Sequence, residues 1–329
     1  MRVLKGIGIF LLIALTAIAA FLYKGEIPKN VVDAKYSSPA SQFFEMENGA
    51  RVHYRDEGNQ EGPVIVLIHG SNASLHTWEP WLREFGSSYR VVTLDLPGHG
   101  LTGGVPDADY SSAAQINTVA AIVDHLGLDK FVLGGNSMGG GVTWRYALAH
   151  QDQVTAMILV DASGPPAWWQ ERRAAQSADK DNEPPLVFEL LGKPWFRAIA
   201  RHIDPYRLTV QGVNSAYNNS PVVDQALIDR YYELSLREGT RDATMARFGN
   251  RRTFDEIVDL SQLHQPTLIM WGKEDSLIPV TMADKFREAL PNATVVLYDD
   301  VGHIPMEEIP VRSAEDVLAF LAALQPDQL

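Results

Sequence analysis

The hydrophobic and polar positions of this chain follow two different periods, which indicates that strands alternate with helices. Residues 64–68 and 157–160 are continuous aliphatic runs, as expected for strands that are buried on both faces. Residues 112–126 and 138–149 carry apolar side chains at helical spacing instead. This alternation is typical of βαβ units. We therefore predict an α/β fold: a mostly parallel sheet with helices on both faces.

The other elements are predicted from the same patterns. Asn48-Gly49 lies between two short segments, 42–47 and 51–56, and this dipeptide is a strong signal for a two-residue hairpin. Further strands are predicted at 90–94, 131–133, 267–271 and 294–297, and further helices at 78–85, 280–289 and 312–324.

The alternation stops near Gly164 and resumes only after about Leu260. Between these points the pattern is helical, without a convincing buried strand, and it is rich in proline and in large aromatic side chains. A sheet domain interrupted by a helical insertion is the most economical interpretation. We expect the first part of the core at 42–164, the insertion at 165–260 and the second part of the core at 261–329.

The N-terminus forms a segment of a different kind. Arg2 and Lys5 precede an apolar run from Ile7 to Tyr23, and Lys24 follows it. A run of about 17 apolar residues is at the short end of what spans a bilayer as a helix. We therefore expect residues 1–24 to be an uncleaved membrane anchor.

Two alternatives to an anchor remain open. Ala17-Ile18-Ala19 has the form of a signal-peptidase site, so residues 1–24 could be a cleaved signal peptide. A buried N-terminal helix is the third possibility. Residues 25–41, which contain prolines and serines but few apolar residues, are expected to be a linker.

Charge and cysteine content exclude several classes of function. The formal net charge of −13 argues against nucleic-acid binding, because contact with phosphates needs a basic surface. The chain contains no cysteine, which removes disulfides, thiolate metal sites and a cysteine nucleophile. No metal-ligand spacing or dinucleotide motif is present, so we expect no metal and no cofactor.

A serine between a predicted strand and a predicted helix is the candidate nucleophile. Gly135-Asn136-Ser137-Met138-Gly139 matches G-x-S-x-G in the strand–turn–helix context that this motif requires. The turn is so tight that its serine adopts a strained backbone conformation and its neighbours two residues away must be small. The following helix N-terminus favours negative charge that develops at the serine.

A serine hydroxyl needs a base, and the base needs an orienting acid. His303 follows the predicted strand 294–297, and Asp275 follows the predicted strand 267–271. Both positions agree with the chain order serine, acid, histidine. We predict a Ser137–Asp275–His303 triad, and we keep Asp161, after strand 157–160, as a second possible acid.

An oxyanion hole requires two backbone N–H groups. We expect one from Met138, directly after the serine, and one from Ser71, on the loop after strand 64–68. Gly70 lets this loop approach a substrate closely. His69 is expected to be structural.

Five motifs together resemble the α/β-hydrolase superfamily over about residues 42–324. They are His69-Gly70, Asp95-Leu-Pro-Gly-His-Gly100, Gly135-Asn-Ser-Met-Gly-Gly140, Trp271-Gly-Lys-Glu-Asp275 and Gly302-His303. Within the superfamily the serine motif resembles bacterial esterases and lipases of the Moraxella/Psychrobacter type, and also carbon–carbon bond hydrolases of aromatic-ring degradation. Epoxide hydrolases and haloalkane dehalogenases place aspartate where this chain has Ser137. The resemblance implies that residues 165–260 form a cap over the site, and that the His99 loop shapes a turn.

These observations predict a serine hydrolase that cleaves a small carboxylic ester with an apolar acyl group. The alternatives are a carbon–carbon hydrolase of ring-fission diketones, a cofactor-free perhydrolase or haloperoxidase with the same triad, and a binding protein that has lost catalysis. Membrane association is expected through residues 6–23. This segment would anchor the enzyme at the bacterial cell envelope with its catalytic domain exported; after signal cleavage the protein would be secreted or periplasmic.

Overall fold

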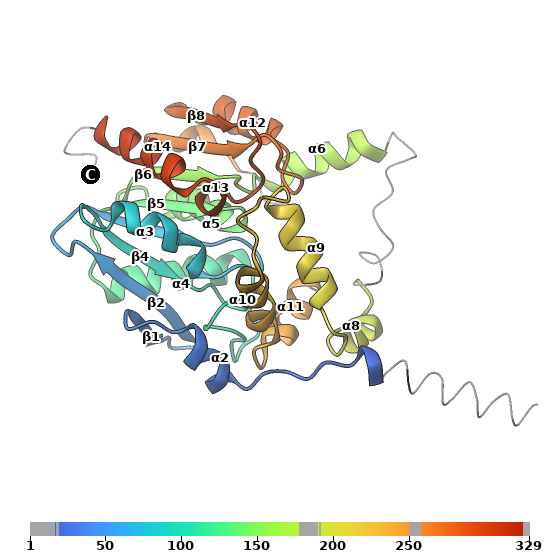
Figure 1. Cartoon of the computed structure of the whole chain (residues 1–329). Coiled ribbons are helices and arrows are strands. Elements are labelled where there is room, and N and C mark those ends of the chain that lie inside the picture. The colour runs from blue at the N-terminus through green and yellow to red at the C-terminus, as the bar shows by residue number, and fades with distance from the viewer. Residues whose placement is uncertain (1–16, 18–19, 178–189, 191, 250–257, 325–329) are drawn as a thin grey trace, which may run out of the picture.

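A single eight-stranded sheet forms the centre of the molecule (Figure 1). The computed structural model describes residues 17, 20–177, 190, 192–249 and 258–324. The strand order is β1-β2-β4-β3-β5-β6-β7-β8. β1 and β2 pair with their neighbours in antiparallel fashion, and all pairs from β4 to β8 are parallel. This is the predicted α/β fold with a mostly parallel sheet.

Each strand predicted from the sequence is present. The bounds are β1 Ser41–Glu45, β2 Arg51–Gly58, β3 Val64–Ile68, β4 Arg90–Leu94, β5 Phe131–Asn136, β6 Val154–Val160, β7 Thr267–Gly272 and β8 Ala293–Tyr298. The hairpin turn predicted at Asn48-Gly49 joins β1 to β2, and Gly49 has a positive φ of 78°. Glycine adopts this conformation at no steric cost.

Helices cover both faces of the sheet, because successive strand side chains point to opposite faces. In β3, Val66 and Ile68 pack on one face with α4 (Ser112–His125), α5 (Met138–Ala149) and α12 (Thr281–Ala289). Ile65 and Leu67 pack on the other face with α3 (Glu79–Phe85) and α14 (Pro310–Ala322). The short helices η1 (Leu75–Trp78), η2 (Leu260–Gln262) and α13 (Pro305–Glu308) complete the core.

Residues 165–260, called the cap from here on, are helical where they are described. The cap contains α6 (Pro166–Ser177), α8 (Pro194–Ala200), α9 (Tyr206–Ala216), α10 (Gln225–Leu236) and α11 (Thr240–Gly249). The described part of the cap adds no strand to the sheet. In Figure 1, α9, α10 and α11 lie at one end of the sheet.

The segment that was expected to be a linker is partly helical and is attached to the cap. It contains α2 (Lys29–Tyr36). Asp33 pairs with the buried Arg237 of the cap at 2.7 Å, and the amide of Ile27 donates to the carbonyl of Leu236 at 2.8 Å. The side chain of Lys35 pairs with Glu233 at 2.6 Å. These contacts fix residues 27–36 against α10 and the residues that follow it.

Most of the apolar run predicted as an anchor, residues 7–23, lies outside the described residues. Within the described part of the chain, no helix has the length and apolar character needed to cross a membrane.

Candidate active site

Ser137 occupies a strained turn between β5 and α5. Its φ is 54° and its ψ is −117°, a combination that a residue with a side chain rarely adopts. The amide of Ser137 donates to the carbonyl of Val160 at 2.9 Å and so ties the turn to β6. A Cβ at Gly135 would lie 2.4 Å from Gly139, and one at Gly140 would lie 2.4 Å from the Ala162 side chain. Only glycine therefore allows this turn to close.

The turn leaves Ser137 partly exposed at the N-terminus of α5. Unpaired N–H groups at a helix start carry partial positive charge. The N-terminus of α5 therefore stabilises negative charge on the hydroxyl oxygen of Ser137, or on a group bonded to that oxygen.

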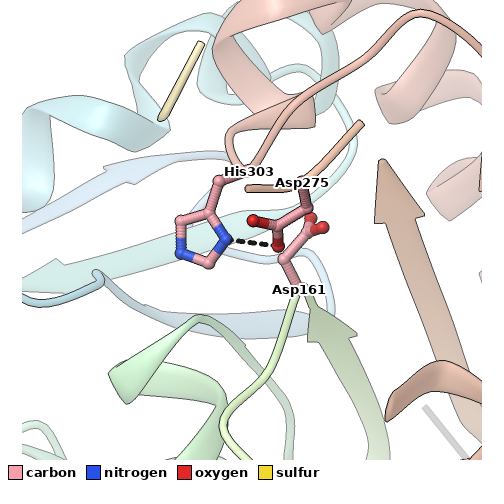
Figure 2. Close-up of side chains that lie close together, drawn as sticks. All are labelled: Asp161, Asp275 and His303. Carbon is pink, nitrogen blue, oxygen red and sulfur yellow. Dashed lines mark hydrogen bonds and ion pairs between the residues drawn. The ribbon is translucent and has the colours of Figure 1, made fainter. Parts of the chain in front are cut away.

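His303 and Asp275 form a buried pair at the ends of neighbouring strands. Their Nδ1 and Oδ2 atoms are 2.6 Å apart, and their relative exposures are 3% and 8%. Asp275 also accepts hydrogen bonds from the amides of Leu277 and Ile278, at 2.7 and 3.0 Å. These amides fix the carboxylate, which in turn places the His303 proton on Nδ1 and leaves Nε2 able to accept one (Figure 2).

The loop that carries His303 is held from two directions. Glu308 accepts hydrogen bonds from the amides of Gly302 and Ile304, at 3.1 and 3.2 Å. Burial raises the pKa of Glu308, and these amides oppose that rise. From the cap, the carbonyl of Ala216 at the end of α9 accepts the amide of His303 at 2.7 Å. The cap is therefore in direct contact with the candidate base.

The side chain of Asn136 connects the serine turn to the histidine loop. Its amide donates to the carbonyl of His303 at 3.0 Å and to that of Val160 at 3.2 Å. The structure records no hydrogen bond between the hydroxyl of Ser137 and the ring of His303, both of which are described. Such bonds are often long in an unliganded site and tighten when substrate binds.

The loop after β3 lies against the serine turn. A Cβ on Gly70 would lie 2.7 Å from Oδ1 of Asn136 and 3.1 Å from Cβ of Ser137. The predicted oxyanion residues therefore lie on two segments that meet at Ser137: Ser71 directly follows Gly70, and Met138 begins α5. Within the described chain, neither of their amides donates a hydrogen bond.

His69 supports this loop in a neutral state. Its Nε2 accepts the amide of Leu96 at 3.0 Å, so the proton lies on Nδ1, which donates to the carbonyl of Gly70 at 2.7 Å. Burial lowers the pKa of His69. The geometry is that of a structural histidine, as the sequence predicted.

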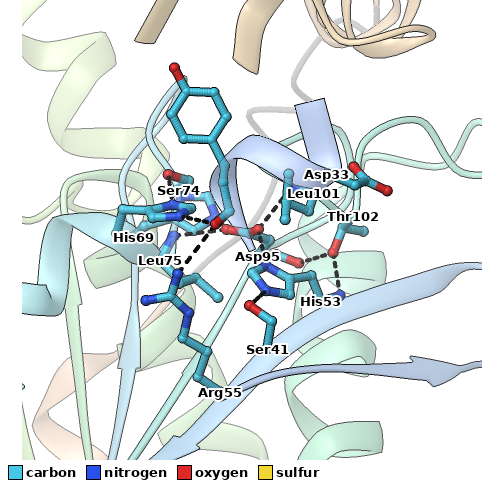
Figure 3. Close-up of polar contacts among 12 residues, drawn as sticks. Asp33, Ser41, His53, Arg55, His69, Ser74, Leu75, Asp95, Leu101 and Thr102 are labelled. Atoms are coloured by element: carbon cyan, nitrogen blue, oxygen red, sulfur yellow. Dashed lines mark hydrogen bonds and ion pairs between the residues drawn. The ribbon is translucent and has the colours of Figure 1, made fainter. Parts of the chain in front are cut away.

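A buried carboxylate anchors the surrounding loops (Figure 3). Asp95 accepts hydrogen bonds from His53 Nδ1 at 2.7 Å and from the amides of Leu75 and Leu101, at 2.7 and 2.8 Å. Burial alone would raise the pKa of Asp95, but the hydrogen bond and charge of His53 outweigh it and hold the pKa below its ordinary value. His99, in the same motif, has its pKa lowered by burial and lies against Arg247 of the cap.

Asp161, the alternative acid, lies in the same cluster as the predicted one. Among the described residues, only one group of three or more histidine, aspartate or glutamate side chains is close enough to bind a metal. It consists of Asp161, Asp275 and His303, whose candidate ligand atoms lie within 4.8 Å of one another. A metal would have to displace the hydrogen bond between His303 and Asp275. The geometry fits a proton-handling cluster better than a metal site.

Sequence reasoning missed several residues that shape the site. Asn136 was recognised only as part of the serine motif, and its bond to the His303 loop is a contact between distant segments. Glu308 carried one usable signal: it is an acidic residue five positions after the candidate base, on a short helix. The contact from Ala216 had no signal in the sequence.

The alpha/beta hydrolase fold family matches residues 63–310. Lipase 1 of Psychrobacter immobilis is 24% identical over 85% of this chain and 83% of its own length. The 2-hydroxy-6-oxo-6-(2'-aminophenyl)hexa-2,4-dienoic acid hydrolase of Metapseudomonas resinovorans is 26% identical over 88% of this chain and 94% of its own. A solved structure of a membrane phospholipase A, a bacterial virulence factor, shares the fold with a TM-score of 0.67 and 24% identity over 98% of both chains.

Proposed function

The chain belongs to the alpha/beta hydrolase fold family and is a hydrolase, and we propose that it is a serine hydrolase that cleaves carboxylic esters with an apolar acyl group. Its catalytic triad is Ser137, Asp275 and His303. The observation that carries this proposal is the combination of a strained serine at the start of α5 with the buried His303–Asp275 pair.

The reaction is acyl transfer through a covalent intermediate. His303 Nε2 removes the hydroxyl proton as Ser137 Oγ attacks the ester carbonyl. The amides of Met138 and Ser71 bind the oxyanion of the tetrahedral intermediate. The alcohol leaves with the proton from His303, and water then attacks the acyl-enzyme by the same route in reverse. Asp275 holds the ring tautomer and stabilises the imidazolium.

The preference for an apolar ester is supported by relatives and by the composition of the cap. Psychrobacter immobilis Lipase 1 matches most of the chain. The described cap contains several large aromatic residues, and aromatic side chains are suited to bind apolar groups. They are Trp168, Trp169, Trp195, Phe196, Tyr206, Tyr217, Tyr231 and Tyr232.

A carbon–carbon bond hydrolase is the second candidate, with the same triad. It is favoured by the similarity to the dienoic acid hydrolase of Metapseudomonas resinovorans. Such a substrate carries a carboxylate, which needs a positive group near the site. Arg247 of the cap donates to Oδ1 of Asn72 at 2.8 Å, one residue beyond the predicted oxyanion donor. This places a cation beside the oxyanion loop.

We also propose that the protein is attached to the membrane of the cell envelope through residues 6–23, with the catalytic domain exported. The end of this apolar segment is joined to the cap, because Lys24 donates its amide to the carbonyl of His202 at 2.9 Å. Phe21 and Tyr23 are 84% and 61% exposed, and Trp195 on α8 is 59% exposed. Apolar side chains of this size are suited to a membrane surface.

Ester hydrolysis by the full-length chain tests the proposed reaction. We would measure kcat/KM for p-nitrophenyl esters from acetate to palmitate, and for a ring-fission dienoate, with Ser137→Ala in parallel. We expect ester turnover that the variant loses, and the chain-length profile defines the acyl preference. Turnover of the dienoate alone would replace the ester proposal with the second candidate. Inactivity of the wild type on both substrate classes, or full activity of the variant, would contradict a serine hydrolase.

A further inference from the structure

Three buried carboxyl groups lie near His303, two beside its ring and one on the loop that carries it, but the triad uses only one of them. They are Asp161, Asp275 and Glu308, which belong to three different segments. Asp161 is fully buried and directly follows β6, where its φ of 45° turns the chain away from the sheet. A buried carboxyl group without a charge partner is costly, so its presence here calls for a physical explanation.

The three carboxyl groups differ in whether their oxygen atoms have hydrogen-bond donors. Both oxygens of Asp275 accept hydrogen bonds, from two amides and from His303. Glu308 accepts the amides of Gly302 and Ile304. Asp161 Oδ1 accepts the amide of Gly272 at 3.0 Å. Asp161 Oδ2 is buried and has no donor among the described residues.

The oxygen without a donor lies beside a carboxylate. The candidate ligand atoms of Asp161, Asp275 and His303 lie within 4.8 Å of one another, and Figure 2 shows the two carboxyl groups next to each other. Two buried carboxylates at this distance repel each other, and one proton removes the repulsion. Asp275 accepts three hydrogen bonds, which favour its ionised form, so the proton belongs on Asp161.

We propose that Asp161 is a positioning residue of the triad: its protonated carboxyl group donates a hydrogen bond to Asp275, on the carboxylate that binds His303. The result is a chain Asp161–Asp275–His303 with one proton in each of its two links. Its role in catalysis rests on the proposed serine hydrolase function. Burial and the charge of Asp275 raise the pKa of Asp161 well above its ordinary value, in agreement with this arrangement.

The charged and titratable groups around Asp161 all come from other elements. Asp275 follows β7, His303 follows β8, Glu308 ends α13 and Tyr298 ends β8. Glu308 adds to the negative potential, and burial raises the pKa of Tyr298, which keeps its hydroxyl neutral. Only His303 can carry positive charge in this group. The second hydrogen bond to Asp275 withdraws charge from that carboxylate, so the carboxylate stabilises the imidazolium of His303 less strongly.

Two substitutions separate this role from simple packing. Asp161→Asn keeps an oxygen for the Gly272 amide and an N–H donor for Asp275, and asparagine tolerates a positive φ. Asp161→Leu has a similar size but no donor. We would measure the pH dependence of kcat/KM for an ester, and the NMR titration of the His303 ring, in the full-length wild type and both variants. Thermal unfolding checks that each variant is folded.

We expect the acid limb of kcat/KM and the His303 titration midpoint to move upward by about 0.5 to 1 pH unit in Asp161→Leu. Both should stay at the wild-type pH in Asp161→Asn. Equal midpoints in all three proteins, or equal shifts in both variants, would overturn the proposal. If Asp161→Leu does not fold, the Asp161→Asn titration decides: an unchanged midpoint supports a neutral Asp161, whereas a midpoint below that of wild type would show that the variant has removed a negative charge and would overturn the proposal. The NMR titration needs no turnover, so it separates this proposal from the ester proposal.

Discussion

The side-chain amide of Asn136 donates a hydrogen bond of 3.0 Å to the backbone carbonyl of His303. Asn136 directly precedes the candidate nucleophile, and His303 is the candidate base. The bond therefore fixes the distance between two loops whose relative position the chemistry requires. A second bond to Val160 fixes the same side chain to β6.

Removal of this link should reduce both activity and stability. Asn136→Ala leaves the buried carbonyl of His303 without this donor, at a cost of about 1–3 kcal/mol, and releases the histidine loop, so we expect kcat to fall about tenfold or more. Urea unfolding and ester kinetics measure the two effects. Asn292→Ala is the matched control, because Asn292 donates to a single carbonyl, that of His264, at an exposed position. An Asn136→Ala enzyme with wild-type kcat would show that the link does not align the site.

A methyl group at Gly70 should damage the oxyanion loop specifically. The added Cβ would lie 2.7 Å from Oδ1 of Asn136 and 3.1 Å from Cβ of Ser137, so the loop must move away from the nucleophile. Loss of one oxyanion donor costs about 10²–10³ in rate, and we expect Gly70→Ala to reduce kcat by at least about tenfold, with little change in KM. Gly212→Ala, on α9 where an added Cβ meets no atom within 4 Å, should leave kcat unchanged. Similar kcat values for Gly70→Ala and Gly212→Ala would contradict the proposal that Ser71 donates to the oxyanion.

The proton on Asp161 predicts a pH-dependent difference in stability. The raised pKa of Asp161 means that the folded protein keeps a proton that the unfolded chain releases above about pH 4. This group therefore stabilises the fold most at low pH, and its contribution declines as pH rises toward the folded-state pKa. Asp161→Asn removes the decline. The melting temperature of Asp161→Asn relative to wild type should rise from pH 5 to pH 8. Glu308, whose pKa is also raised, affects wild type and variant alike and so does not contribute to the difference. A melting-temperature difference that is constant over this range would show that Asp161 does not carry a proton in the folded protein.

Loss of the Asp95 carboxylate should destabilise the loops beneath the oxyanion segment. Asp95→Asn replaces one acceptor oxygen by a donor that faces His53 Nδ1 and backbone amides, so we expect a loss of about 2–4 kcal/mol at pH 7. Because the pKa of Asp95 is lowered in the fold, its stabilisation is complete above about pH 4 and is lost as pH falls further. Urea unfolding at pH 7 and pH 3.5 should show the larger difference at pH 7. Equal stability of both proteins at pH 7 would contradict this role for Asp95.

The main architecture could be read from the sequence because it depends on local periodicity. Continuous aliphatic runs such as 64–68 and 157–160 mark strands buried on both faces, and all eight predicted strands are present. The carboxyl ends of parallel strands meet at one edge of the sheet. The positions of Ser137, Asp275 and His303 after three such strands therefore predicted their proximity.

Contacts between distant segments carried no such signal. The sequence offered Asp161 and Asp275 as alternative acids, whereas the fold places both carboxyl groups beside His303. The expected linker contains α2 and pairs with the cap through Asp33 and Arg237. This contact had no signal, because complementary charges 204 residues apart cannot be matched from one sequence.

Covalent labelling of the nucleophile tests the central claim most directly. The full-length protein would be incubated with an alkyl fluorophosphonate and its adducts located by intact-mass and peptide mass spectrometry, beside Ser137→Ala and His303→Ala. We predict a single adduct on Ser137, none in Ser137→Ala, and labelling slowed by about 10³-fold or more in His303→Ala. An adduct on another residue, or equal labelling in all three proteins, would contradict Ser137 as a nucleophile that His303 activates.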